Sequence, residues 1–128
     1  MSININQIAD EINKIFAGYG DEIVQAVNES AEEVAKACAQ NLRQTSPKDS
    51  GKYAKNWKAK RQSGSGGKGQ VWVVYNEKHY RLTHLLEYGH AKKGGGRVRA
   101  IPHIAPAREE AEEMFVQKAL EAIGRVTG

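Results

Sequence analysis

The sequence predicts an α+β fold in which a small antiparallel sheet packs against a long helix of the N-terminal half and a C-terminal helix. Two apolar stripes with helical spacing, one within residues 21–44 and one from residue 107 onward, flank a region with one strong strand signal. The chain has 128 residues, of which 40% are hydrophobic, and this suits one modest core. We therefore predict a single domain spanning residues 1–128.

Two helices are predicted before residue 45. A short amphipathic helix within residues 1–18, which could extend from the domain, has apolar residues at three- and four-residue spacing: Ile5, Ile8, Ile12, Ile15 and Phe16. Asn4 is placed to cap its first turn. The long helix over residues 21–44 has the apolar stripe Val24, Val27, Ala31, Val34, Cys38 and Leu42. Its only cysteine is predicted to be a small buried core residue.

The middle of the chain predicts a loop followed by a hairpin. Residues 45–51 are a cluster of turn formers, so a loop is expected there. Residues 52–62 fit either a helical turn or a strand, and we favour a strand that begins near Asn56. Residues 71–75 give the strongest strand signal, and the Ser, Gly and Lys residues of 63–69 are predicted to be the flexible tip between the two strands.

A short helix and a basic segment precede the last helix. Residues 80–88 suit a helix that Gly89 terminates, although residues 82–88 could also be extended. Residues 91–100 predict a flexible basic loop or a second hairpin. The stripe of the C-terminal helix comprises Ala107, Ala111, Met114, Phe115, Ala119, Ala122 and Ile123. Glutamates at 109, 110, 112 and 113 are expected in its first turns, where they would suit the helix dipole.

Basic side chains are concentrated in the middle of the chain. Residues 43–70 hold eight basic and one acidic side chain, and residues 71–108 hold seven and two. The ends are acidic, with two basic and seven acidic side chains in residues 1–42 and two and five in residues 109–128. The layout suits nucleic-acid binding, a solvated face, or basic segments that meet the acidic helices of a neighbouring copy. The candidate assembly interface comprises Lys52, Lys55, Lys58, Arg61, Lys68, Lys92, Lys93, Arg97 and Arg99.

No motif indicates catalysis or a bound cofactor. Gly64, Gly66 and Gly69 have the spacing of a dinucleotide-binding fingerprint, but a strand follows them where that motif needs a helix. His84 and Glu87 could share a helical face in a metal-dependent hydrolase that also uses His90, but Tyr88 stands where an inverted zincin motif has its second His. We predict no catalytic, metal-binding or cofactor-binding residues, no enzymatic activity, no small-molecule substrate and no membrane segment.

Several blocks of the sequence, in order, resemble the tail-completion or minor tail component family of long-tailed bacteriophages, the gene-product-ten-like group encoded just after the head–tail connectors. A helix ends in the loop from Pro47 to Gly51, and a hairpin ends in residues 71–76. The most specific part is the block Leu86-Glu87-Tyr88-Gly89 with Pro102 and Pro106 downstream. The resemblance covers residues 21–125, with His90 and His103 standing where Thr and Phe are usual.

The resemblance implies a small α+β structural protein that assembles, usually as a ring, at the head–tail interface or completes the tail, without cofactor or catalytic residues. It implies a homo-oligomer, other phage tail or connector proteins as partners, and a place in the virion after synthesis in the host bacterial cytoplasm. The alternative is a nucleic-acid-binding module that uses the basic segments. For Glu87 two interpretations are open: an exposed helix charge, or a carboxylate that pairs with Arg97 or Arg99.

Overall fold

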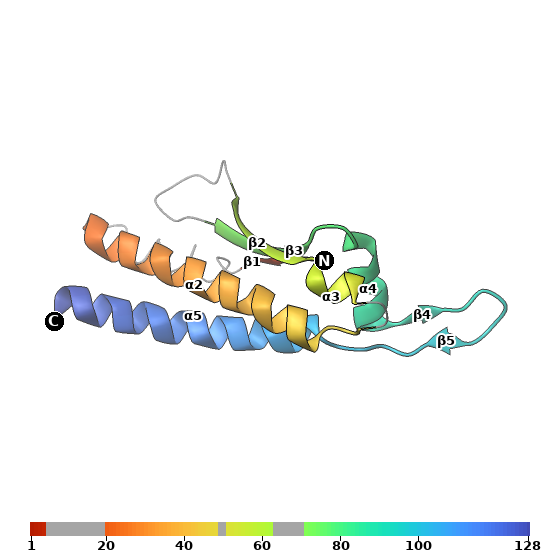
Figure 1. Ribbon diagram of the computed structural model, residues 1–128. Coiled ribbons are helices and arrows are strands. Elements are labelled where there is room, and N and C mark those ends of the chain that lie inside the picture. The colour runs from red at the N-terminus through yellow and green to blue at the C-terminus, as the bar shows by residue number, and fades with distance from the viewer. Residues whose placement is uncertain (5–19, 49–50, 63–70) are drawn as a thin grey trace.

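The computed structural model describes residues 1–4, 20–48, 51–62 and 71–128. Its elements are β1 (Ile3–Asn4), α2 (Asp21–Thr45), α3 (Lys52–Lys55), β2 (Trp57–Gln62), β3 (Val71–Asn76), α4 (Tyr80–Tyr88), β4 (His90–Ala91), β5 (Arg97–Val98) and α5 (Ile104–Thr127). The two long helices lie side by side, a small sheet covers α2, and the β4–β5 hairpin extends from one end (Figure 1). The predicted α+β class is confirmed.

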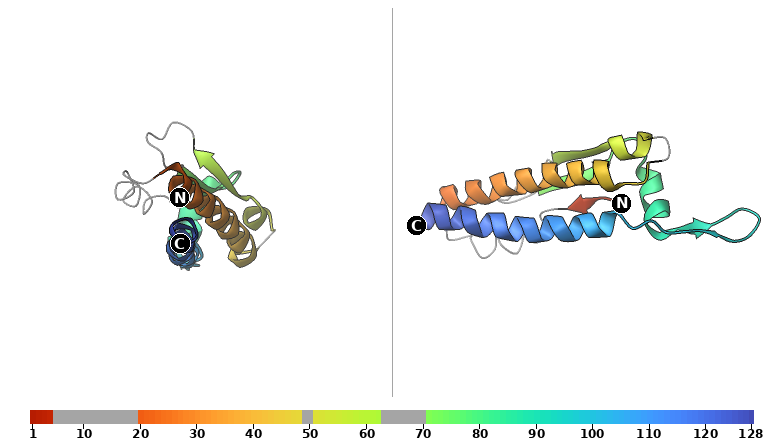
Figure 2. Two further views of the ribbon diagram at one scale, coloured as in Figure 1. Left: turned by 90° about the vertical axis from the view of Figure 1, so that its left-hand side faces the viewer. Right: turned by 60° about the horizontal axis from the view of Figure 1, so that its bottom comes forward.

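Helices α2 and α5 run antiparallel and share the main core. The Sγ atom of Cys38 lies 3.9 Å from the carbonyl oxygen of Ala107, and both residues are buried. Alanines at positions 31, 35, 39, 107, 111 and 119 are buried, and such small side chains allow the two helix backbones to approach closely. Phe115 is the largest side chain that α5 adds to this core. The views in Figure 2 show that the pairing continues along the length of both helices.

The main sheet has the strand order β1-β3-β2, with both pairs antiparallel. Side chains alternate across it, so Trp57, Val74 and Ile3 are buried while Lys58 and Lys60 are exposed. Asn4, the predicted helix cap, pairs with Val73 in β1, and an extended backbone is compatible with a cap position. Burying Ile3 opposite Val74 determines this local structure. The rest of the predicted first helix lies outside the described residues.

Trp57 joins the loop after α2 to the start of β2. Its indole is fully buried, and its Nε1–H donates to the Oγ of Ser46 at 2.8 Å. The guanidinium of Arg43 donates to the carbonyl oxygen of Trp57 at 2.7 Å. These bonds explain why the strand begins at Trp57, next to the predicted Asn56, after the single helical turn of α3.

The remaining predicted elements are confirmed, with two corrections in α5. Helix α4 ends at Gly89, and residues 90–98 form the second hairpin. Helix α5 begins at Ile104, so its first turn contains no acidic residue and the predicted glutamates lie beyond it. Met114 is 38% exposed instead of lying in the apolar stripe. None of the helices in the described part of the chain has the length and apolarity to span a bilayer, and the predicted tip at residues 63–69 lies outside that part.

Candidate assembly surfaces

The β4–β5 hairpin is a basic projection from the body of the protein. His90 pairs with Val98 and Ala91 with Arg97, and the turn between them is closed by the N–H of Lys92, which donates to the carbonyl oxygen of Gly96 at 2.9 Å. The basic hairpin, defined as residues 90–99, carries the exposed side chains of Lys92, Lys93, Arg97 and Arg99. The sequence contains no acidic residue from position 88 to position 108. The hairpin therefore presents four positive charges that no adjacent acidic residue in the sequence offsets.

The glycines of this region have backbone conformations that other residues rarely adopt. The three turn residues 94–96 all have positive φ. Gly89, at the base of the hairpin, has a φ of 74°, and a Cβ there would lie 2.5 Å from the carbonyl oxygen of Val98. Position 89 therefore requires glycine for two reasons: its φ is positive, and the backbone of Val98 lies too close for a Cβ atom. Gly51 also has positive φ, 81°, before α3.

The carboxylate of Glu87 fixes the base of the hairpin to the start of α5. Its Oε1 accepts from the backbone N–H groups of His103 and Ile104, each at 2.8 Å, and its Oε2 accepts from Ala105 at 2.9 Å. Since the first N–H groups of a helix have no partner within the helix, the carboxylate acts as a cap supplied by α4. A second link is the N–H of Ile101, which donates to the carbonyl oxygen of Leu86 at 2.8 Å.

Both interpretations of Glu87 drawn from the sequence are wrong. Its side chain is buried, with 3% exposure. Its partners are the three backbone N–H groups and the Nδ1 of His103, 3.1 Å from Oε1, whereas Arg97 and Arg99 are exposed. Burial alone would raise the pKa of Glu87, but the three backbone N–H donors outweigh it and, with nearby His103, lower the pKa below its usual value. The negative charge is therefore stabilised where α5 begins.

A buried polar network extends this cap to α3. The Oη of Tyr53 lies 2.7 Å from Nε2 of His103, and Nδ1 of the same ring lies 2.7 Å from the carbonyl oxygen of Ile101. A proton on Nδ1 lets the ring donate to the carbonyl oxygen of Ile101, and the hydroxyl of Tyr53 can donate to or accept from Nε2. Burial, followed by the charge of Glu87, raises the pKa of Tyr53. His103 is thus a structural residue at the hairpin base.

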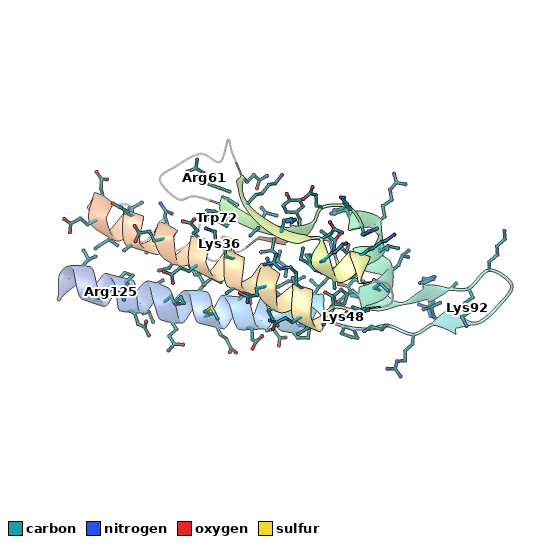
Figure 3. The ribbon with its side chains drawn as sticks, viewed as in Figure 1. Lys36, Lys48, Arg61, Trp72, Lys92 and Arg125 are labelled. Carbon is teal, nitrogen blue, oxygen red and sulfur yellow. The ribbon has the colours of Figure 1, made fainter. Side chains whose placement is uncertain are left out.

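The basic residues predicted for one interface lie on separate surfaces. Four are on the basic hairpin, Lys52 and Lys55 are exposed on α3, and Lys58 and Arg61 are on β2. Lys68 lies outside the described residues. Figure 3 shows Lys92 on the projecting hairpin and Arg61 over the body of the protein. Among the described members of this set, Lys92, Lys93, Arg97 and Arg99 share one projecting hairpin.

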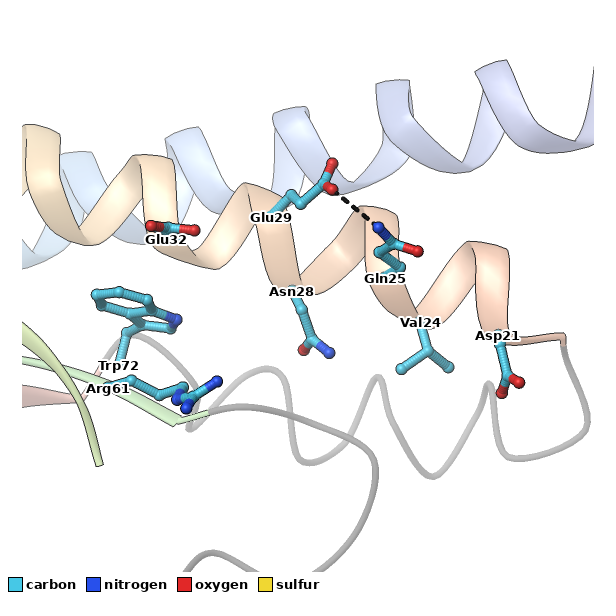
Figure 4. Close-up of a pocket in the computed structure, with 8 residues that line it drawn as sticks. All are labelled: Asp21, Val24, Gln25, Asn28, Glu29, Glu32, Arg61 and Trp72. Carbon is cyan, nitrogen blue, oxygen red and sulfur yellow. Dashed lines mark hydrogen bonds between the residues drawn. The ribbon is translucent and has the colours of Figure 1, made fainter. Parts of the chain in front are cut away.

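Arg61 borders a groove between α2 and the end of the sheet. The groove has a volume of about 760 Å³ and is lined by Asp21, Val24, Gln25, Asn28, Glu29, Glu32, Arg61 and Trp72 (Figure 4). Its described lining contains the carboxylates of Asp21, Glu29 and Glu32 and the guanidinium of Arg61. Across residues 1–4, 20–48, 51–62 and 71–128, no group of three His, Cys, Asp or Glu side chains could hold a metal ion.

A second surface lies on α5, on the side away from α2. Spacings of three and four residues place five exposed side chains on one face of this helix, which we call the outer face of α5: Glu109, Glu112, Glu113, Val116 and Leu120. Val116 is 41% exposed and Leu120 is 64% exposed. This surface was not among the residues predicted from the sequence, because the core stripe of the same helix accounts for its helical periodicity. The sequence signal that could have revealed this surface is the pair Val116 and Leu120, two apolar residues four positions apart that follow a run of glutamates.

Exposed aromatic residues adjoin the hairpin on α4. Tyr80 and Tyr88 are each 55% exposed, and the ring of Tyr88 lies 5.0 Å from that of His84. Tyr88 immediately precedes Gly89, so this face is continuous with the hairpin along the chain. Tyrosines exposed in this way are common at protein–protein contacts. The hairpin, α4 and the outer face of α5 therefore present exposed charged, aromatic and apolar side chains.

Comparison with known proteins identifies the family. The family described as "Bacteriophage HK97-gp10, putative tail-component" matches residues 6–89. No curated protein and no solved structure matches the chain. The family match includes α2, the β2–β3 strand pair, α4 and the Leu86-Glu87-Tyr88-Gly89 block. Because it spans more than half of the sequence, the protein belongs to this family of phage tail components.

Proposed function

We propose that this tail component works by oligomeric assembly, as a ring subunit of the head–tail interface, and not by catalysis. The observation that carries the proposal is the basic hairpin, which projects beyond the end of the paired helices (Figure 1). A projection of one charge sign beside a body with acidic helices suits a head-to-tail contact between identical subunits. Family membership supports a place in the virion and contacts with other tail proteins.

The hairpin is suited to this role because its base is held and its turn is exposed. The base is held by the hydrogen bonds of Glu87 and His103 and by the close approach of Gly89 to the backbone of Val98. Residues 92–96 of the turn, in contrast, are exposed, and two backbone hydrogen bonds join Lys92 to Gly95 and Gly96 within the turn. A fixed direction reduces the entropy lost when the hairpin docks on a neighbouring subunit.

The proposal is tested in the phage or prophage that carries the gene. Deleting the gene is expected to leave heads and tails unjoined or tails incomplete in electron micrographs, and a plasmid copy should restore infectious particles. Cross-linking of complemented particles should yield a ladder of subunit multiples. Normal particle yield without the gene would overturn the tail role, and a cross-linked product no larger than one subunit would overturn the ring.

A binding assay separates assembly from nucleic-acid binding, the alternative that the basic charge alone allows. If the basic segments bound DNA, affinity for a duplex would fall steeply with salt because phosphate contacts release counterions. If the hairpin charges instead bind a neighbouring subunit, we expect no such affinity of the assembled protein for the duplex. Tight, salt-dependent binding that is lost on replacing the four hairpin residues with glutamine would favour the alternative.

A further inference from the structure

The outer face of α5 has the chemistry of a docking surface. Its two apolar residues, Val116 and Leu120, lie four residues apart and are flanked by three glutamates on the same side of the helix. A shallow depression on this face is lined by Glu112, Glu113, Val116, Gln117 and Leu120. Solvated helix faces are usually polar throughout, so Val116 and Leu120 beside the glutamates are the unusual feature.

The carboxylates of this face are available for a partner. Among the described residues, Glu109, Glu112 and Glu113 make no ion pair or hydrogen bond through their side chains. On α2, in contrast, Glu32 pairs with Lys36 at 2.8 Å and Glu33 with Lys118 at 3.1 Å. Part of the acidic charge of α2 is therefore already offset within the chain.

The basic hairpin matches this face in both charge and apolar content. Lys92, Lys93, Arg97 and Arg99 supply four positive charges against three carboxylates. Apolar side chains lie among them, since Val98 is half-buried and Ile101, just after the hairpin, is 42% exposed. An interface needs apolar contact at its centre with charges around it, and these two surfaces provide that combination.

The geometry makes the partner a second copy. Helix α5 starts at the end of the molecule from which the hairpin emerges, and the two extend in opposite directions (Figures 1 and 2). The hairpin turn therefore points away from Val116 and Leu120 of its own chain. The hydrogen bonds from Ile104 and Ala105 to Glu87 hold the base of the hairpin against the start of α5.

We propose that the basic hairpin of one copy docks on the outer face of α5 of a second copy. The inference rests on the proposed function and specifies which surfaces meet. The contact is heterologous, because two different surfaces meet, and its repetition closes into a ring or continues as a filament according to the rotation between copies. It is expected to weaken with salt, because exposed charges at the rim are screened.

Charge reversal tests the pairing on the full chain. Sedimentation velocity at about 50 mM and about 500 mM salt would measure self-association of the wild type, of Arg97→Glu/Arg99→Glu and of Glu112→Arg/Glu113→Arg. We expect self-association of the wild type at low salt and about tenfold weaker association for each double variant. The quadruple variant, which combines both double substitutions, should recover self-association, because its reversed charges are again opposite in sign. Circular dichroism confirms that each variant is folded.

A matched control uses α2. Glu22→Arg/Glu29→Arg reverses two exposed charges of α2, and combining it with the reversed hairpin is not expected to restore association. Recovery with the α2 pair and not with the α5 pair would overturn the assignment of the docking face. A wild-type protein that stays monomeric at low salt would overturn docking between copies, whereas the tail role is tested separately by the gene deletion.

Replacing Leu120 with Glu should weaken association without lowering thermal stability, and a lower melting temperature instead would show that this face is covered within one chain.

Discussion

The Oε1 atom of Glu87 accepts a hydrogen bond of 2.8 Å from the backbone N–H of Ile104, so the last turn of α4 caps the first turn of α5. The two residues are 17 positions apart, and the basic hairpin lies between them. One carboxylate therefore closes the loop that contains the hairpin. Because this closure stabilises α5 and also directs the hairpin, stability and assembly are expected to depend on the same side chain.

Replacing Glu87 with Gln should destabilise the protein by about 2 kcal/mol near pH 7, because a neutral amide accepts more weakly from the three buried N–H groups. The pKa of Glu87 is lowered from its usual 4.5 in the folded state. The stabilisation by the carboxylate is therefore complete above pH 4.5 and is lost as pH falls through the lowered pKa. Urea unfolding at a series of pH values should therefore show that the free energies of unfolding of the wild type and the Glu87→Gln variant converge in acid.

The control for that measurement is Glu77→Gln, which changes an exposed carboxylate after β3. It should leave the free energy of unfolding within about 0.5 kcal/mol of wild type. A wild-type protein whose stability advantage over the Glu87→Gln variant grew in acid would contradict the cap.

Replacing Gly89 with Ala should destabilise the protein by about 3 kcal/mol, because the positive φ and the contact with the carbonyl oxygen of Val98 both oppose a Cβ. Gly94→Ala is the matched comparison, since Gly94 also has positive φ but no atom lies within 4 Å of a Cβ there. It should cost only about 1 kcal/mol. Thermal unfolding of both variants checks that Gly89→Ala loses more stability than Gly94→Ala. Equal losses of stability would mean that the close approach at the hairpin base is unimportant.

Replacing Tyr53 with Phe should cost about 1 to 2 kcal/mol, because Nε2 of His103 is buried and would lose its hydrogen-bond partner. Tyr80→Phe, at an exposed position, should be close to neutral. Chemical denaturation of the two variants makes the comparison. A loss as large at Tyr80 as at Tyr53 would show that the hydroxyl–imidazole bond contributes little.

The thiol of Cys38 should resist modification in the native protein. Burial, with a further contribution from nearby Glu110, raises its pKa to about 12, so very little thiolate forms near pH 8. A thiol reagent is expected to react rapidly only after denaturant is added. Rapid labelling of the native protein would mean that α2 and α5 separate locally on the time scale of the reaction.

Local pattern in the sequence was sufficient for most elements. Helical spacing predicted α2, the β-branched run predicted β3, and glycine predicted the end of α4. These features depend on side-chain periodicity and turn chemistry, which act over a few residues. The pairing of Asn4 with Val73 in β1 could not be predicted in this way, because it is a contact over a long sequence separation.

The sequence by itself determined the fold class, the long helices, the distribution of charge and the resemblance that the family match confirms. Only the tertiary structure decided that Glu87 caps α5, that four of the predicted basic residues form one projection, and that Val116 and Leu120 face away from the core. Local patterns predict the elements, because they express which side chains prefer burial or a turn. Which surfaces remain uncovered depends on how the elements pack, and the candidate assembly surfaces follow from that packing.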